Sequence, residues 1–257
     1  MSTTTSREQW KLTIVPGPAE VAHHGADRVV VAVRHESDLV LSVPTGSTPL
    51  GMFDALAQRS QRGDVDFSHV ELFCLDEYVG LTVEDPNSLT AWLMKAFAER
   101  VGIAASRVHT LPATDDDLAW AARSYEASLT ALGGLDLAVL GLGPNGHVAY
   151  NEPGSAADSR TRVVDLTAES IAQASAYWHN SVPIPSTALT IGIATLLEAR
   201  HIVLLVTGQA KAEILRLALA EPMSANVPAS WMRRAGPRLE IIADEAAADR
   251  LAQTTFG

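Results

Sequence analysis

The chain has 257 residues, of which 47% are hydrophobic and 19% are charged, as is typical of globular proteins rather than disordered chains. Its net charge of -11 argues against nucleic acid or an anionic membrane as the main partner. Cys74 is the only cysteine, so an internal disulfide is excluded and a thiolate metal cluster is not expected. Residues 1–9 lack the apolar core of a signal peptide, and no apolar run reaches membrane-spanning length. We therefore expect a cytoplasmic protein.

Apolar runs of strand length alternate with helix-like stretches along the chain. Strands are predicted over residues 12–15, 38–43, 70–75, 136–140, 201–207 and 239–243, and helices over 18–35, 48–61, 88–101, 115–132 and 209–220, with a further helix after the last strand. Continuous apolar strands separated by helices indicate a mostly parallel sheet covered on both faces. The prediction is an α/β fold of three layers (α/β/α) with a Rossmann-like sheet. We expect a single domain over 1–257, disorder over 1–9, and an irregular stretch over 152–186 that is a candidate active-site lid.

The first motif is PTGSTP at residues 44–49, between a predicted buried strand and a predicted helix. Thr48 suits the N-cap and Pro49 the first helical position. Gly46 allows close approach of the backbone to a ligand, and free N–H groups at a helix N-terminus bind anions. The Gly-Lys-Ser/Thr ending of a Walker A loop is absent. An anion-binding loop and an ordinary capped turn both fit this segment.

Two adjacent acids, Asp76 and Glu77, follow the third predicted strand. A carboxylate at the carboxyl end of a strand can serve as a general base. The alternative is an aspartate that starts a turn beside a solvated glutamate. Because parallel strands end on the same edge of a sheet, these acids are expected near the other motifs.

The third motif is GLGPNGHVAYNEPG at residues 141–154, directly after the predicted strand over 136–140. Its first six residues fit the dinucleotide fingerprint G-x-G-x-x-G, but that fingerprint needs a helix, which VAYNEPG cannot begin. His147 and Glu152 stand five residues apart in this loop. They suggest a proton-transfer pair, with a structural histidine as the alternative.

Lys211 falls in the first turn of the helix predicted over 209–220. A cation there opposes the helix dipole unless an anion lies between the two, although an exposed lysine is equally compatible with the sequence. The histidines show no zinc-ligand spacing, and no G-x-S-x-G nucleophile motif occurs. We therefore predict no metal site.

Six segments, in order along the chain, resemble the glucosamine-6-phosphate deaminase (isomerase) family, which shares its fold type with 6-phosphogluconolactonases. They are PTGSTPLGMF (44–53), FCLDEYVGL (73–81), GLGPNGHVAYNEPGS (141–155), SRTRVVDLT (159–167), ALTIGIATLLEA (188–199) and VTGQAKAEIL (206–215). The most specific parts are LDEY and GHVAYNEPG. A lactonase would be expected to follow its Gly-His with a Ser/Phe-Pro-type sequence.

The resemblance implies a reaction that needs no cofactor: opening of an amino sugar phosphate ring, transfer of a proton from C2 to C1, and hydrolysis of the resulting imine. The products would be fructose 6-phosphate and ammonia. By resemblance, His147 is the acid and base of ring opening with Glu152 in support, and Asp76 removes the C2 proton. The positions matching phosphate-binding residues are Thr45, Gly46, Ser47, Thr48 and Lys211.

Two residues depart from the family pattern. Asn145 stands where many members carry an aspartate that pairs with the histidine; an asparagine can orient an imidazole but cannot stabilise imidazolium by charge. Ala176 stands where members typically carry an arginine that grips the phosphate. Loss of that contact would cost roughly 1.5–3 kcal/mol. The identity of the sugar is therefore less determined than the chemistry.

The predicted function is an amino-sugar-phosphate deaminase/isomerase. The alternatives are an isomerase, deaminase or lactonase for another sugar phosphate, or a sugar-phosphate sensor without turnover. The expected partner is a small sugar phosphate, with no nucleic acid and no membrane. A homo-oligomer is possible, because the family includes monomers and hexamers. Ser155 and Arg162 match positions tied to effector binding in some members.

Overall fold

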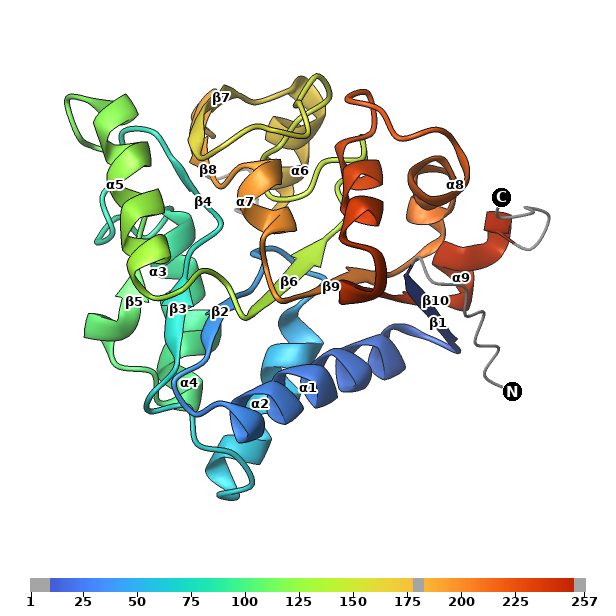
Figure 1. Cartoon of the computed structure of the whole chain (residues 1–257), viewed down its shortest axis with the longest axis horizontal. Coiled ribbons are helices and arrows are strands. Elements are labelled where there is room, and N and C mark those ends of the chain that lie inside the picture. Colours follow the sequence, from blue (N-terminus) through green and yellow to red (C-terminus); the bar gives the residue numbers. More distant parts are fainter. Residues whose placement is uncertain (1–9, 178–182, 252–257) are drawn as a thin grey trace.

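A computed structural model describes residues 10–177 and 183–251 (Figure 1). Its main sheet has seven strands, and every neighbouring pair is parallel. The order across the sheet is β1 (Lys11–Val15), β10 (Leu239–Asp244), β9 (His201–Val206), β6 (Leu137–Gly141), β2 (Val40–Ser42), β3 (Glu71–Phe73) and β5 (Val108–His109). The predicted mostly parallel α/β fold is confirmed.

Helices cover both faces of this sheet. Figure 1 shows α1 (Pro18–His35) and α2 (Leu50–Gln61) on one side, and α6 (Ala168–Tyr177), α7 (Ile193–Leu197) and α8 (Ala212–Ala220) on the other. The central strands are therefore buried on both faces, which is why β6, β9 and β10 read as continuous apolar runs. The largest buried cluster includes residues from Leu12 to Leu251. The single-domain prediction for 1–257 stays a prediction.

The helices predicted over 88–101 and 115–132 are present, and each begins at a capping side chain. The first comprises α3 (Leu89–Leu93), a π-helical turn (Met94–Ala98) and α4 (Glu99–Val101), and the Ser88 hydroxyl accepts from the N–H of Ala91. The second is α5 (Leu118–Ala131), whose cap is Asp117. A four-residue α9 (Glu245–Ala248) and a 3₁₀ turn (Asp249–Leu251) follow β10. Short polar side chains before helical segments mark these starts because they satisfy free N–H groups.

Two predicted helix starts are displaced. Helix α2 begins at Leu50, so the prediction of Thr48 as N-cap is wrong: Pro49 holds that position, without a side-chain cap. The N–H of Leu50 donates to the carbonyl of Ser47, which makes residues 47–50 a turn ahead of the helix. Helix α8 begins at Ala212, and Lys211 ends a preceding 3₁₀ turn (Gln209–Lys211).

The prediction of an irregular stretch over 152–186 is wrong. It contains β7 (Arg162–Asp165) and α6, and β7 joins β4 (Asp76–Tyr78) and β8 (Thr187–Thr190) in a second, antiparallel sheet of order β4-β8-β7. Strand β7 is short and alternates between half-buried and exposed positions, so it lacks the long apolar run that identified the main strands. Residues 178–182, and the N-terminal segment 1–9 predicted to be disordered, lie outside the described residues.

The order of the main sheet determines where a ligand can bind. From β2 the chain proceeds outward to β3 and β5, whereas from β6 it proceeds in the other direction to β9 and β10. The crevice at the carboxyl ends of β2 and β6 is therefore the switch point at which open α/β sheets bind ligands. Within the described ranges, no helix is both long and apolar enough to cross a membrane.

Candidate active site

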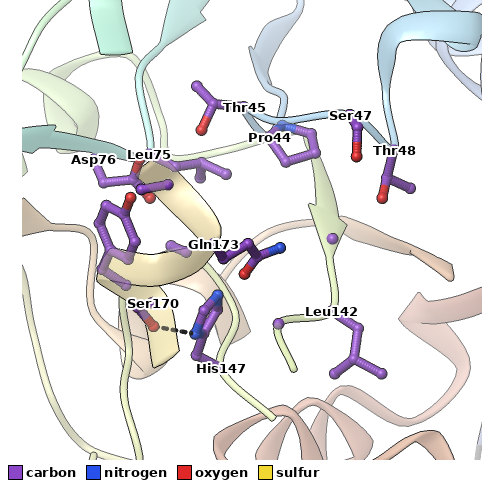
Figure 2. Close-up of a pocket in the computed structure, with 15 residues that line it drawn as sticks. Pro44, Thr45, Ser47, Thr48, Leu75, Asp76, Leu142, His147, Ser170 and Gln173 are labelled. Atoms are coloured by element: carbon purple, nitrogen blue, oxygen red, sulfur yellow. Dashed lines mark hydrogen bonds between the residues drawn. The ribbon is translucent and has the colours of Figure 1, made fainter. Parts of the chain in front are cut away.

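A cavity of about 80 Å³ lies at this crevice (Figure 2). Its walls come from the loop after β2, the start of β4, the loop after β6 and one face of α6. Of the residues that the sequence predicted for a site, those lining it are Thr45, Ser47, Thr48, Asp76 and His147. The other predicted residues, Gly46, Asn145, Glu152 and Lys211, lie outside this lining.

Asp76 is the buried carboxylate of the cavity, with 6% of the residue exposed. It is the first residue of β4 and pairs with Thr190 of β8, so the second sheet fixes its position. Burial, and to a smaller extent the charge of Glu77, raises the pKa of Asp76 to about 7. A carboxylate with this pKa can both take and return a proton near neutral pH.

Glu77 has a different role from its neighbour. Its carboxylate is buried and accepts hydrogen bonds from the N–H groups of Leu89 at 3.0 Å, Thr90 at 2.9 Å and Tyr78 at 2.8 Å. It therefore caps α3, and the alternative of a solvated glutamate is wrong. Successive side chains of a strand point to opposite faces, which is why only Asp76 of this pair reaches the cavity.

The glycines of the 141–154 loop allow His147 to lie against the backbone. A Cβ atom at Gly143 would come 2.2 Å from the imidazole carbon Cδ2, so only glycine permits this ring position. Gly146 has a φ of +88°, and the N–H of Gly143 donates to the carbonyl of His147 at 2.9 Å. No helix begins within the loop, as expected from its sequence. Its glycine pattern therefore serves histidine placement and not a dinucleotide.

His147 and Glu152 form a buried pair, with Nδ1 of the imidazole 3.4 Å from Oε2 of the carboxylate. Burial alone would raise the pKa of Glu152. Hydrogen bonds with His147, Ser170 and Asn145 outweigh that effect and lower the pKa to about 2. The carboxylate is thus ionised beside Nδ1, while the other ring nitrogen faces the cavity (Figure 2).

Asn145 contacts the carboxylate rather than the imidazole. Its Nδ2 donates to Glu152 at 2.6 Å and to the Thr167 hydroxyl at 3.1 Å, while its Oδ1 accepts from the backbone N–H of His147 at 3.2 Å. Orientation of the imidazole by Asn145, which an asparagine could provide, would therefore act through Glu152 and the backbone of His147. The neutral amide provides a donor to Glu152, which an ionised aspartate would instead repel.

The sequence did not indicate two further members of this network, Thr167 and Ser170. The N–H of Thr167 donates to Glu152 at 3.2 Å, and the Ser170 hydroxyl lies 3.2 Å from Nδ1 of His147. The Thr167 hydroxyl also accepts from the N–H of Ser170, so Thr167 caps α6. The available signal in the sequence was Thr167 directly before the run AESIA, because a threonine before such a run is a typical helix N-cap.

The loop after β2 presents hydroxyl groups to the other side of the cavity. Figure 2 shows Thr45, Ser47 and Thr48 along this loop, and Gly46 supports its turn with a φ of +98°. Lys211 ends the 3₁₀ turn that follows β9, a strand separated from β2 by β6, and burial lowers the pKa of its ammonium group. Among the described residues, this ammonium group has no hydrogen-bond or ion-pair partner. A partly buried ammonium group has lost part of its hydration, so an anionic partner such as a phosphate would stabilise it.

Comparisons with known proteins agree with this arrangement. Residues 18–240 match the family described as glucosamine-6-phosphate isomerases/6-phosphogluconolactonase. The chain belongs to this family.

Curated relatives in the family are named glucosamine-6-phosphate deaminase. One from Rhodopirellula baltica is 40% identical, over 94% of this chain and 96% of the relative. One from Beutenbergia cavernae is 39% identical, over 94% of this chain and 92% of the relative. The solved structure of a monomeric glucosamine-6-phosphate deaminase superposes with a TM-score of 0.88 at 32% identity, covering 93% of this chain and 99% of that one.

The family's other branch shares the fold. The 6-phosphogluconolactonase of Trypanosoma brucei has a TM-score of 0.75 at 19% identity, covering 93% of this chain and 98% of that one. At this identity the similarity concerns architecture alone. The sequence-based assignment to the deaminase/isomerase family and to the α/β fold is confirmed.

The structure also places the position at which an arginine is typical of the family. Ala176 lies in α6, one turn after Gln173, whose side chain lines the cavity. Among the described residues, the lining of the cavity contains no arginine or lysine. Lys211 is the one lysine or arginine among the residues predicted for the site, and is therefore the candidate cation for a phosphate.

Proposed function

We propose that this protein is an amino-sugar-phosphate deaminase/isomerase that converts glucosamine 6-phosphate and water to fructose 6-phosphate and ammonia. One observation carries the proposal: Asp76 and His147 line the same cavity as the hydroxyl-bearing loop after β2. The high identity to named deaminases over nearly the whole chain supports this substrate.

Ring opening is the first step. His147 takes the proton of the C1 hydroxyl and delivers a proton to the ring oxygen as the C1–O5 bond breaks, which leaves an open-chain aldehyde. The ionised Glu152 beside Nδ1 stabilises the imidazolium that forms in between. Asn145, Thr167 and Ser170 hold that carboxylate and ring in place.

Proton transfer between carbons is the second step. Asp76 removes the proton from C2, the C2–H electron pair forms the C1=C2 bond of an enolamine, and the electron pair of the C1=O bond moves to O1, which takes up a proton. The nitrogen lone pair then forms the C2=N bond as the same carboxyl returns its proton to C1 and the nitrogen loses a proton. The C2 imine then adds water and releases ammonia, leaving the C2 ketone. The pKa of about 7 lets Asp76 be ionised before the step and protonated during it.

The phosphate is assigned to the loop after β2 together with Lys211. Hydroxyl groups of Thr45, Ser47 and Thr48 and the N–H groups of this turn would donate to the phosphate oxygens. The ammonium group of Lys211, partly buried and unpaired among the described residues, would supply the positive charge.

Helix α6 is proposed as part of a lid. The cavity of about 80 Å³ is smaller than the roughly 300–1,000 Å³ of most small-molecule pockets. Ser170, Gln173 and Ala174 of α6 form one wall. Outward movement of α6 would admit the sugar, and its return would exclude water from the reacting carbons.

The experiment is an assay of purified protein with glucosamine 6-phosphate, in which ammonium and fructose 6-phosphate are both measured. We expect equal amounts of the two products, and a decrease of about 10²–10⁴-fold in kcat for Asp76→Asn, because removal of a general base has that effect. Release of neither product, with identical behaviour of Asp76→Asn, would overturn the proposal.

Two further measurements on the same purified protein distinguish the remaining alternatives. Turnover of another amino sugar phosphate in preference to glucosamine 6-phosphate would favour a different sugar, for which Ala176 is the motivating residue. Calorimetric binding of the sugar phosphate without turnover would favour a sensor. We also propose a cytoplasmic location. A homo-oligomer stays a prediction, which measurement of the molar mass by light scattering would test.

A further inference from the structure

A second cavity lies at the opposite edge of the main sheet. Its volume is about 470 Å³, within the range of about 300–1,000 Å³ that is usual for small-molecule pockets. It is lined at the amino ends of four strands, by Lys11 of β1, Leu137 of β6, His201 of β9 and Glu240 of β10. We call it the amino-end cavity. None of the proposed catalytic residues lines it.

One wall of the amino-end cavity is apolar and partly open to solvent. Val31 of α1 is 60% exposed, although it lines the cavity beside Ala32, Ile202 and Pro237. An exposed aliphatic side chain at the mouth of a cavity leaves apolar surface in water, and an apolar ligand group would cover it favourably.

A second wall carries an excess of positive charge. Glu240 accepts two hydrogen bonds from Arg28, at 2.6 and 3.0 Å, and also forms an ion pair with Lys11 at 2.8 Å. Arg238 lines the same cavity, and its Nη1 donates to the backbone carbonyls of Leu197 and Ala199. Three cations therefore face a single carboxylate on this wall.

These cations retain free donors for a ligand. Among the described residues, Nη1 of Arg28 and both Nε and Nη2 of Arg238 have no hydrogen bond, and the Lys11 ammonium, with three donors, has only Glu240. A carboxylate, sulfonate or phosphate oxygen accepts from such donors with charge assistance.

The far wall has the opposite sign. Arg200 lies 2.9 Å from Asp136 and 3.3 Å from Glu36, so one cation serves two carboxylates there. A ligand anion would therefore be directed to the wall of Lys11, Arg28 and Arg238, and its apolar body toward Val31.

We propose that the amino-end cavity is a second ligand site, which takes a small organic anion with one charged group and an apolar body. The charge asymmetry fixes its orientation, and the cavity volume limits its size. The site lies at the amino ends of the strands, whereas the proposed reaction takes place at their carboxyl ends, so a ligand bound here does not contact the proposed catalytic residues.

The test uses 8-anilinonaphthalene-1-sulfonate, a fluorescent organic anion with an apolar body, and the full-length protein. We expect one saturable site by fluorescence and by calorimetry, with weaker binding at higher salt. Binding should persist in the presence of saturating fructose 6-phosphate. Non-saturable binding, or displacement by fructose 6-phosphate, would overturn the proposal.

Matched variants locate the site. Lys11→Gln should weaken binding of the probe about threefold or more, whereas Lys95→Gln, which removes the same charge from an exposed helical position, should not. Val31→Glu should weaken it further, and Val83→Glu, at a valine that is 43% exposed in a loop, should leave it unchanged. Circular dichroism checks that each variant is folded. Equal affinities in both members of each pair would contradict the assignment.

Discussion

At the scale of single residues, the proposed chemistry depends on how completely Asp76 is buried. Its carboxyl faces a cavity but lies on β4, all three residues of which are buried. Burial raises the pKa of Asp76 to about 7, whereas hydrogen bonds with His147, Ser170 and Asn145 outweigh burial and lower the pKa of Glu152 to about 2. Two carboxylates in one site thus have opposite protonation behaviour because their neighbours differ.

The first prediction concerns the pH dependence of turnover. A base with a pKa raised to about 7 is protonated, and therefore inactive, below that pH. We expect kcat/KM to rise about tenfold per pH unit on the acidic side and to level off above about pH 7. Glu152 remains ionised throughout this range. A limb centred near pH 4 in a pH–rate profile would contradict the role given to Asp76.

The second prediction concerns the placement of His147. In Gly143→Ala the new methyl group would lie 2.2 Å from the imidazole, so the ring must move. We expect a fall in kcat of about 10²-fold or more with the fold retained, because a displaced general acid loses most of its effect. Gly141→Ala is the matched control, since its Cβ would meet only Pro44, at 4.0 Å. Equal kcat values for the two variants would contradict this explanation of Gly143.

At the scale of elements, the N-terminus of α6 links the second sheet to the site. β7 ends at Asp165, α6 begins at Ala168, and the residues at this junction contact both members of the His147–Glu152 pair. Any movement of α6 therefore changes the hydrogen bonds of the imidazole. The proposed lid and the proposed proton transfer depend on the same few contacts.

The third prediction tests this link through Ser170. Ser170→Ala removes the hydroxyl that lies 3.2 Å from Nδ1 of His147, and we expect kcat to fall by about five- to thirtyfold, equivalent to about 1–2 kcal/mol. Ser170→Thr should restore most of the rate, because it restores the hydroxyl. Ser128→Ala, in the exposed part of α5, is the control. A loss confined to KM, or no rescue by threonine, would contradict a positioning role.

The fourth prediction concerns α3. Glu77 accepts two backbone hydrogen bonds at the start of this helix, from Leu89 and Thr90, and a third from Tyr78. A glutamine has only one acceptor oxygen at that position. We expect Glu77→Gln to lower the free energy of unfolding by about 1–3 kcal/mol in urea titrations. Glu99→Gln, at an exposed position, should change it little. Unchanged stability of Glu77→Gln would show that the carboxylate is not needed as a cap.

At the scale of the whole molecule, the two edges of the main sheet have different character. The carboxyl edge holds the proposed catalytic cavity, and the amino edge holds the larger amino-end cavity with its separated charges. The strands β6 and β9 run from one to the other. The net charge of -11 does not predict whether either cavity binds an anion, because the cations and hydroxyl groups near each cavity determine that.

The fifth prediction concerns metal removal. The proposed chemistry uses an imidazole and two carboxylates, and the described part of the chain contains no group of three or more His, Cys, Asp or Glu side chains placed to hold a metal ion. We expect dialysis against EDTA to leave ammonium release unchanged. A loss of rate that Mg²⁺ or Zn²⁺ restores would contradict a cofactor-free reaction.

The sequence by itself determined six of the seven strands of the main sheet, missing only the two-residue β5, and it indicated the two residues, Asp76 and His147, that line the cavity with the proposed catalytic roles. The long apolar runs of β6, β9 and β10 identify buried parallel strands, because such strands need no polar face. Because parallel strands end on the same edge of a sheet, the sequence predicted that Asp76 and His147 lie near each other. Glycine-rich spacing indicated the loop that holds the histidine.

Only the tertiary structure decided the rest, because those features depend on partners distant in the chain. Strand β7 is half exposed and is defined by pairing with β8 rather than by an apolar run of its own. Ser170 joins the site 23 positions after His147 through the packing of α6. The pKa of Asp76 follows from burial, which no local pattern encodes. Local patterns determine which elements form, whereas packing between them determines what their side chains can do.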